Sequence, residues 1–285
     1  MTKNALSKTQ IDRLGERLKG GSHTENDLRL LDEYRSSFGE AYEVVARTVR
    51  ERGQSPTGRL AKSTQSIVEK LRRESIRLSQ MQDIAGCRIV VTNVMEQGRV
   101  VAELRVAFPG ASVIDRRDKP SHGYRAIHVI AVVPDQPVEI QVRTELQHLW
   151  AELSEKSSDI VDPAIKYGGG PKEWRDLLAR RSEAVAAYEN FEGPHSKLVA
   201  ALEADVAAHV ESRKAAAEML EHHPPDHIVR DIRGRLEELT RSIERDEQDL
   251  AELRRDKARS RDSTAGSLSQ VISWLDERRG KEQKR

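Results

Sequence analysis

The sequence predicts an α/β protein, with a mixed β-sheet flanked by helices and a C-terminal region that is helical throughout. The strongest evidence is residues 138–143, where Val, Ile and Val alternate with Glu, Gln and Arg. Such alternation is typical of a strand with one face in a core. Apolar runs at 85–92 and 124–133 predict neighbouring strands, and the segments after the Gly-rich stretch 168–171 follow a helical pattern. A mixed sheet with helices packed on it is therefore the expected core.

Composition excludes several classes of protein. Of the 285 residues, 37% are hydrophobic and 33% charged, and the formal net charge is +1. This balance argues against a generally basic nucleic-acid-binding protein. The lone cysteine, Cys87, lies in a predicted strand and is interpreted as a small buried residue in a reducing compartment. Because no apolar run is long enough to span a membrane and no signal peptide opens the chain, we expect a cytoplasmic protein without a membrane partner.

The first half of the chain is divided into N-terminal helices (1–54) and a core (55–167). Thr24 and Asp27 form a capping-box variant that begins a predicted helix over 24–53. The remaining expected elements are a basic helix at 64–77, strand 85–92, helix 94–108, strand 111–117, strands 124–133 and 137–143 paired as a hairpin, and helix 145–160.

The C-terminal region (172–285) is expected to contain helices at 172–190, 195–220, 228–259 and 267–279. Apolar residues in the third of these follow an alternating four-three spacing, interrupted only by Asp246, that predicts a coiled-coil-like seam: Ile232, Leu236, Leu239, Ile243, Leu250 and Leu253. We favour a hairpin with helix 195–220, since a short connection makes neighbouring helices antiparallel. The seam also suits a second copy of the chain or another partner. The histidines 222, 223 and 227 are interpreted as a polar loop rather than a metal site.

Five segments resemble motifs of the RelA/SpoT-type (p)ppGpp synthetases, and they occur in that family's order. They are KSTQSIVEK (62–70), DIAGCRI (83–89), GYRAIH (123–128), EIQVRT (139–144) and WAE (150–152). The chain is therefore similar to a small, single-synthetase-domain alarmone synthetase, or to the toxic branch of that group. The resemblance implies a nucleotidyltransferase-like core and transfer of pyrophosphate from ATP to a ribose 3′-hydroxyl, with Mg²⁺ as cofactor.

The resemblance also implies roles for individual residues. Asp83 and Glu139 would bind the metal and be catalytic, with Glu139 able to accept the proton of the attacking hydroxyl. The ATP-binding set would be Arg59, Lys62, Lys70 and Arg88, although Ala61 occupies the position where the family has the arginine. The acceptor-binding set would be Tyr124, His128, Gln141 and Arg143. Arg125 points to the other face of a regular strand, which predicts a bend or a structural salt bridge, and Arg73 and Arg77 are interpreted as solvated.

Departures from the family concern the acceptor. Pro120 replaces the family's lysine, with Lys119 one position earlier. The histidine that such synthetases carry shortly after this tryptophan, Trp150 here, is absent from 151–156, and Lys166-Tyr167 has inverted order. With fewer cations near the stacking tyrosine, the sequence narrowly favours the 3′ end of tRNA as the acceptor, its outer phosphates held by Arg72, Arg73, Arg116 and Arg117.

Three functions stay open from the sequence. The first is a growth-inhibiting toxin that modifies tRNA and is held in check by an antitoxin. The second is an alarmone synthetase that uses GDP or GTP, and the third is a non-catalytic nucleotide-binding protein acting through its helical tail. The intact Asp83 and Glu139 count against the third. Residues 172–285 are expected to regulate or assemble rather than to catalyse.

Overall fold

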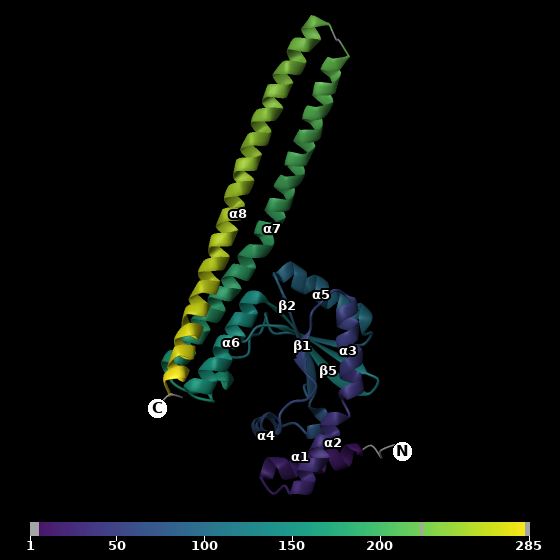
Figure 1. Ribbon diagram of the computed structural model, residues 1–285, viewed down its shortest axis with the longest axis vertical. Coiled ribbons are helices and arrows are strands. Elements are labelled where there is room, and N and C mark those ends of the chain that lie inside the picture. Colours follow the sequence, from purple (N-terminus) through teal and green to yellow (C-terminus); the bar gives the residue numbers. More distant parts are fainter. Residues whose placement is uncertain (1–5, 223–224, 283–285) are drawn as a thin grey trace.

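The structure, a computed structural model, describes residues 6–222 and 225–282, apart from the side chains of Arg59 and Glu282. An α/β body carries a long antiparallel hairpin of two helices that extends well beyond it (Figure 1). The structure confirms the predicted fold class. It also confirms the favoured alternative for the seam, a hairpin within the chain. No helix of the described residues is long and apolar enough to cross a membrane.

The described part of the chain contains a five-stranded sheet in the order β1-β2-β5-β4-β3. Strands β2 and β5 pair in parallel, while the other neighbouring strands pair antiparallel, so the sheet is mixed as predicted. The strand bounds are β1 Thr57–Arg59, β2 Ala85–Val91, β3 Ser112–Asp115, β4 Ile127–Val133 and β5 Gln136–Thr144.

Helices cover the apolar face of the sheet. The helix bounds in the body are α1 Lys8–Gly20, α2 Glu25–Ser36, α3 Gly39–Glu51, α4 Thr64–Arg73, α5 Val94–Ala107 and α6 Glu145–Ile160, with short 3₁₀ turns η1 Leu78–Gln80 and η2 Ile165–Tyr167. Helices α3 and α5 both pack against β2, β4 and β5. Their buried residues join Val138, Ile140 and Val142 in one core, which also takes in residues of α1 and α2. The opposite face of β5 is left to Glu139, Gln141 and Arg143.

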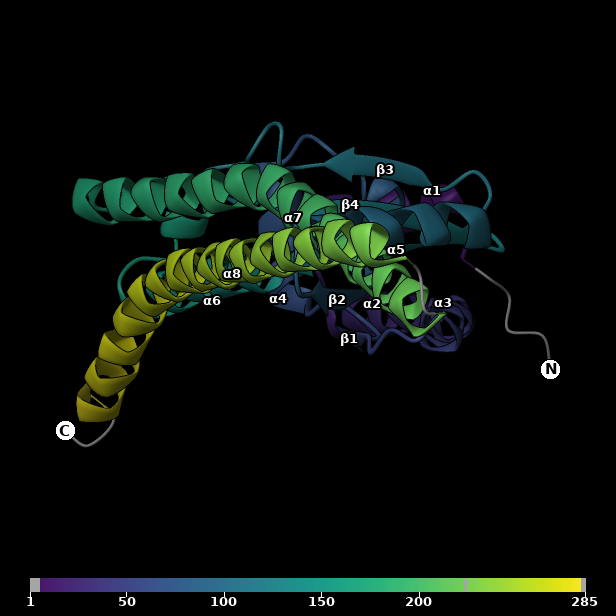
Figure 2. The ribbon, with the colours of Figure 1, turned by 90° about the horizontal axis from the view of Figure 1, so that it is seen from above.

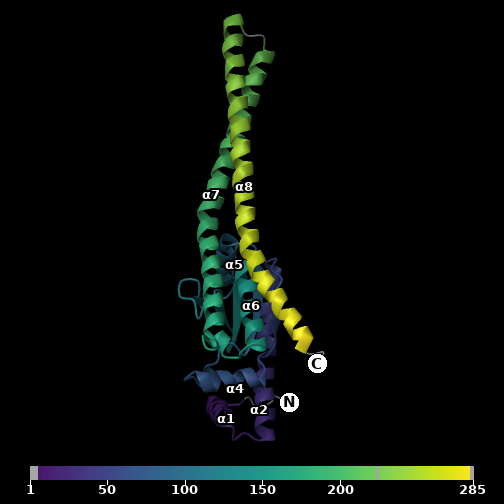
Figure 3. The same ribbon diagram turned by 90° about the vertical axis from the view of Figure 1, so that its left-hand side faces the viewer.

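The hairpin consists of α7 (Lys172–Glu221) and α8 (Asp226–Glu282), which lie side by side in two views (Figures 1 and 2). Near the body the end of α8 diverges from α7, with α6 between them (Figure 3). There Trp150, Val185, Leu268 and Leu275 belong to a second core. Further out, all six residues of the predicted seam are buried or half-buried, which accounts for their spacing.

Several predicted boundaries are wrong. The helix expected over 24–53 is broken at Ser37 and Phe38, where Phe38 turns into the core beside Tyr34 and Gly39 begins the next helix. The predicted capping box at Thr24 is confirmed.

The basic helix ends at Arg73, and the strand expected from 124 begins only at Ile127. The strand expected over 111–117 is the shorter β3. Strand β1 was not predicted.

The breaks expected at 191–194 and 260–266 are absent from the described helices, because α7 runs through Pro194 and α8 runs through Gly266. Packing of each long helix against the other offsets the cost of an internal proline, about 3 kcal/mol in an isolated helix. The loop histidines are only partly described, since His223 lies outside the described residues. His222 is exposed and donates to the Glu218 carbonyl.

Candidate active site

The polar face of β5 forms one wall of the site. Residues 139, 141 and 143 point to the same side because strand side chains alternate. The antiparallel partner β4 places His128 directly opposite Gln141, and the parallel partner β2 places Arg88 opposite Gln141 from the other side. The predicted grouping of Glu139, Gln141 and Arg143 on one face is therefore confirmed.

A closed ring of hydrogen bonds joins five side chains on this face. The Glu139 carboxylate lies 2.9 Å from His128 Nδ1 and accepts a bond from Gln141 Nε2 at 2.7 Å. His128 Nε2 lies 2.9 Å from the Tyr124 hydroxyl. Arg143 Nη2 closes the ring, donating to Tyr124 at 3.0 Å and to Gln141 Oε1 at 2.7 Å.

One donor in the ring follows from Glu139. An ionised Glu139 is only an acceptor, so His128 Nδ1 donates in their contact, and His128 Nε2 forms the next hydrogen bond of the ring with the Tyr124 hydroxyl. Burial raises the pKa of Tyr124, which keeps it a phenol and a donor. Burial also raises the pKa of Glu139, but the contacts with His128 and Gln141 outweigh burial and hold it below its ordinary value. Glu139 is thus ionised at neutral pH.

Asp83 is the second carboxylate of the site, and two lysines hold it. Lys62 Nζ lies 2.6 Å from one carboxylate oxygen and Lys70 Nζ lies 2.9 Å from the other. Burial raises the pKa of Asp83, yet the two lysines keep it below its ordinary value. Helix α4 begins at Thr64, so Lys62 lies in the segment that precedes it and only Lys70 lies on the helix. The path of the chain into α4, and not a shared helix face alone, therefore brings the two lysines together.

Two cavities meet at these carboxylates. The first, of about 640 Å³, is also lined by Thr57, Lys62, Ser66 and Arg88. The second, of about 830 Å³, is also lined by Lys70, Arg116, His122, Tyr124 and His128. Their shared lining consists of Arg73, Asp83, Glu139, Gln141, Arg143, Lys166 and Tyr167. Two ligands bound in these cavities would therefore face each other across Asp83 and Glu139.

The sequence-predicted residues divide between the two cavities. Lys62 and Arg88, assigned to ATP, line the first, whereas Tyr124 and His128, assigned to the acceptor, line the second. Lys70, also assigned to ATP, lines the second and reaches Asp83 from that side. The backbone of Arg59, in β1, pairs with that of Gly86 in β2, but the Arg59 side chain lies outside the described part of the chain.

Three residues of the shared wall were not included in the predicted ATP-binding or acceptor-binding set: Arg73, Lys166 and Tyr167. Arg73 is exposed, as predicted, yet its guanidinium lies 3.8 Å from the centre of the Tyr167 ring. Lys166 also lies against this ring, at 5.1 Å. The sequence contains a pattern that could have identified Arg73. Residues 62, 66, 70 and 73 follow a four-four-three spacing, which places them on one side of a helix and of the segment that leads into it.

Other sequence expectations have clear outcomes. Arg125 forms the predicted structural salt bridge, with its Nε 3.4 Å from Glu189 on α7. Cys87 is buried, and burial raises the pKa of its thiol to about 12, consistent with a packing role. Arg77 is exposed, 3.8 Å from Asp12.

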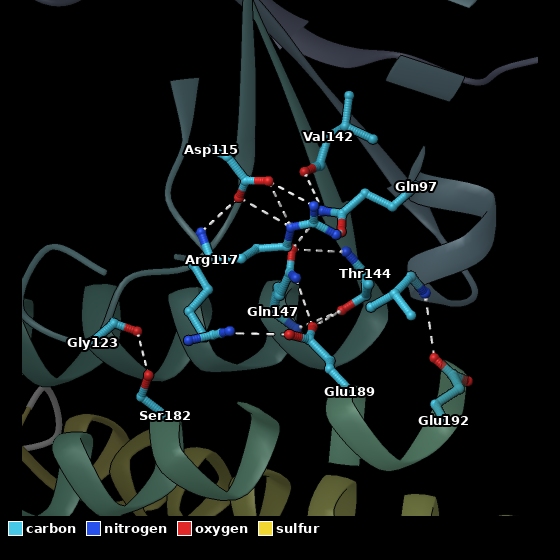
Figure 4. Close-up of polar contacts among 12 residues, drawn as sticks. Gln97, Asp115, Arg117, Gly123, Val142, Thr144, Gln147, Ser182, Glu189 and Glu192 are labelled. Atoms are coloured by element: carbon cyan, nitrogen blue, oxygen red, sulfur yellow. Dashed lines mark hydrogen bonds and ion pairs between the residues drawn. The ribbon is translucent and has the colours of Figure 1, made fainter. Parts of the chain in front are cut away.

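Arg117 binds protein groups rather than lying free to bind the phosphates of tRNA. It was assigned to outer phosphates, but it is bound by both oxygens of Asp115 and by Gln97 (Figure 4). Arg72 donates to the carbonyl of Lys19. Lys119 is exposed and absent from the lining of either cavity described above.

Comparison with known proteins identifies the segment that holds this site. Residues 58–158 match the model of the region found in RelA/SpoT proteins. The chain carries a RelA/SpoT region. Asp83, Glu139 and the hydrogen-bonded ring all lie within it, whereas Lys166 and Tyr167 lie beyond its end.

Relatives of the RelA/SpoT region include uncharacterised proteins of Mycobacterium tuberculosis and Mycobacterium bovis. Each is 42% identical over 118 residues, a match that spans 40% of this chain and 43% of the relative. The match thus covers less than half of the length of these relatives.

Among solved structures, the chain is similar to the small alarmone synthetase 1 from Bacillus subtilis. The identity is 26% and the TM-score 0.45, and the match covers 62% of this chain and 98% of that one. The same protein bound to its product pppGpp gives 29% identity and a TM-score of 0.43, with 60% of this chain and 96% of that one covered.

Proposed function

We propose that the protein is a pyrophosphokinase that transfers the β,γ-pyrophosphate of ATP to a ribose 3′-hydroxyl. The observation that carries the proposal is the shared wall of the two cavities, which holds Asp83 and Glu139 between the space lined by Lys62 and Arg88 and the space lined by Tyr124 and His128. Group transfer between two bound substrates requires such an arrangement, because the reacting atoms must meet in a fixed geometry.

ATP would occupy the first cavity. Lys62 and Arg88 line it and supply the cations that polyphosphates need. Lys70, which shares Asp83 with Lys62, would hold the phosphate tail where it reaches the second cavity.

The acceptor would occupy the second cavity, with its base stacked on the Tyr124 ring. The acceptor's 3′-oxygen attacks the β-phosphorus, the bond from the β-phosphorus to the oxygen shared with the α-phosphate breaks, and AMP leaves. Glu139 takes the proton of the hydroxyl. Its lowered pKa keeps it ionised and ready, and burial strengthens its interaction with a nearby proton donor.

Two features support Mg²⁺ as the cofactor. Asp83 and Glu139 line the same wall, and the proximity of Asp83 raises the pKa of Glu139, so a divalent cation would relieve their repulsion. Among the described residues no three His, Cys, Asp or Glu side chains gather as a ready-made metal site. Mg²⁺ does not require one, since it is commonly held by one or two carboxylates with substrate phosphates and water. When bound, it would neutralise charge that develops on the transferred phosphates.

For the acceptor we propose a free guanosine 5′-diphosphate or triphosphate. The sequence favoured tRNA because few cations were expected near Tyr124. The second cavity is lined by Lys70, Arg73, Arg116 and Lys166, which together suit the acceptor's own 5′-phosphates. The choice of guanine as the base of this acceptor is based on the resemblance of the motifs to those of the RelA/SpoT family.

The 3′ end of tRNA is the second candidate, because Arg73 and Arg116, two of the four arginines suggested for its outer phosphates, line the second cavity and would serve either acceptor. Of the other arginines suggested for tRNA phosphates, Arg72 and Arg117 bind protein groups, which weighs against a continuous phosphate track. The antitoxin and the homo-oligomer expected from the sequence stay predictions.

The proposal is tested by the products of ATP cleavage. With Mg²⁺, ATP and GDP present, AMP should form in equal amount to a guanosine product heavier by two phosphates, as measured by chromatography with mass spectrometry. Formation of ADP and inorganic phosphate, or of AMP without a modified acceptor, would contradict pyrophosphate transfer.

A further inference from the structure

The base of α7 lies against the loop and the strand that carry the acceptor side of the site. Three buried polar residues of α7 face the body there: Ser182, Glu189 and Glu192. Figure 4 shows them reaching toward different parts of the body. None of them belongs to the matched RelA/SpoT region, which ends at residue 158.

The backbone of Tyr124 lies outside the sheet, although its hydroxyl contacts His128 of β4 and Arg143 of β5. Tyr124 precedes β4, which begins at Ile127, and its backbone is fixed locally by one bond from its N–H to the Ser121 carbonyl and a bridge to the same residue. A residue in a loop needs other contacts to keep one position. Its two neighbours in the chain provide them.

Both neighbours of Tyr124 are anchored to α7. The Ser182 hydroxyl donates to the Gly123 carbonyl at 2.7 Å, and Glu189 lies 3.4 Å from Arg125 Nε. Gly123 also has a φ of +90°, and a side chain there would collide with Trp150. The loop therefore approaches α6 and α7 too closely to shift without loss of these contacts.

Glu189 also holds the end of β5. Its Oε1 accepts bonds from Gln147 Nε2 at 2.6 Å and from the Thr144 hydroxyl at 3.1 Å (Figure 4). Thr144 follows Arg143, which donates to the Tyr124 hydroxyl. One carboxylate thus connects the loop before β4 to the strand that carries the other side of the hydrogen-bonded ring.

We infer that Glu189 and Ser182 are positioning residues for Tyr124, and that the base of the C-terminal hairpin completes the acceptor site. The inference rests on the proposed function. Residues 172–285 were expected only to regulate or assemble. Under this inference that expectation no longer covers the base of α7, which belongs to the catalytic unit. Among the described contacts, the two lysines assigned to ATP bind Asp83 in the shared wall and make no contact with α7.

Glu192 offers a matched control. It lies three residues from Glu189 on the same helix, and both side chains are almost fully buried. It accepts bonds from the Val94 N–H and the Tyr188 hydroxyl and pairs with Lys257, and these contacts do not include the Tyr124 loop or β5.

The test compares Glu189→Gln, Ser182→Ala and Glu192→Gln in the full chain. Glu189→Gln keeps the shape but removes the charge that pairs with Arg125, and it places an amide donor among donors. We expect the KM for GDP to rise on the order of tenfold in Glu189→Gln and severalfold in Ser182→Ala, with the KM for ATP unchanged. Glu192→Gln should lower Tm but leave both KM values near wild type. Equal changes in the two KM values, or the same effect from Glu192→Gln, would overturn the inference.

Hydrogen exchange gives a second measurement that does not depend on the reaction. The amides of Tyr124 and Arg116, which bond to Ser121 and Ala126, should exchange faster in Glu189→Gln and Ser182→Ala but not in Glu192→Gln. If the wild type transferred nothing to GDP while exchange behaved as expected, the proposed function would fail and the positioning would stand. Unchanged exchange in both variants would remove the positioning even in an active enzyme.

Discussion

His128 Nδ1 lies 2.9 Å from the Glu139 carboxylate, and this contact opposes the effect of burial on that carboxylate. Burial favours a protonated Glu139, whereas His128 and Gln141 favour the ionised form. A general base must be ionised at the working pH, so the neighbours of Glu139 determine the acid side of the pH profile.

His128→Ala should therefore shift the acid limb of kcat/KM to higher pH. Without His128, burial dominates, the pKa of Glu139 rises, and more of the carboxylate is protonated at a given pH. At high pH, where Glu139 is ionised in both proteins, the loss should be smaller. The pH profile of the variant checks this; an unshifted acid limb would show that Glu139 is not the group being titrated.

Asp83→Asn and Glu139→Gln should each lower transfer by about 10²–10⁴-fold, because each removes a carboxylate from the shared wall. Glu139→Gln is nearly isosteric and should keep the fold. Asp83→Asn leaves Lys62 and Lys70 without their counter-charge, so we also expect it to lose stability, on the order of 1–3 kcal/mol. Single-turnover assays and thermal denaturation separate the two effects. Near-normal transfer by either folded variant would remove the proposed site.

Lys62→Ala and Lys70→Ala should differ from each other. Lys62 lines the first cavity, so its loss should weaken ATP binding and spare the acceptor. Lys70 lines the second cavity and reaches the shared wall, so its loss should weaken binding of both substrates. Calorimetry on the inactive Glu139→Gln background measures each affinity. Unchanged ATP affinity in both variants would contradict the assignment of the first cavity.

The same lysines should influence stability at acid pH. They hold the pKa of Asp83 below its ordinary value, so Asp83 stabilises the fold above pH about 4 and this contribution is lost as pH falls through the folded-state pKa. In Lys62→Met/Lys70→Met, burial alone remains and the pKa should rise. The double variant should then lose stability less steeply below pH 4 than the wild type, as measured by urea unfolding across pH.

The distal part of the hairpin should be separable from the reaction. Leu239 is half-buried and Ile243 buried along α8, far from the base of α7. Replacing both with Asp should loosen helix packing, at roughly 1–3 kcal/mol per substitution, while transfer persists. Activity, circular dichroism and solution mass measure the outcome. Loss of transfer in a protein with native mass and helicity would show that the distal arm also belongs to the catalytic unit.

Local patterns predicted much of this molecule. The alternation in β5 and the capping residue Thr24 depend on short-range chemistry, so they could be predicted from the sequence. The helix break at Phe38 and the continuity through Pro194 depend on tertiary packing, which outweighs local propensity. Sequence periodicity alone therefore cannot give these boundaries.

The candidate site likewise has one part that the sequence predicts and another part that depends on the fold. Glu139, Gln141 and Arg143 could be grouped because they share a strand face. The meeting of Lys62 and Lys70 at Asp83 depends on how the chain enters α4, and the contact of Glu189 with Thr144 joins residues 45 positions apart. Such long-range contacts follow only from the assembled fold.

The central claim is most directly tested by a competition for labelled pyrophosphate. ATP labelled in its β and γ phosphates is supplied with Mg²⁺, GDP, GTP and bulk tRNA together, at low and at high salt. Glu139→Gln serves as the inactive control. We predict label on guanosine nucleotides, with AMP as the other product and with tRNA unlabelled. Label on tRNA alone would contradict the proposed acceptor, and release of labelled phosphate with no labelled acceptor would contradict pyrophosphate transfer itself.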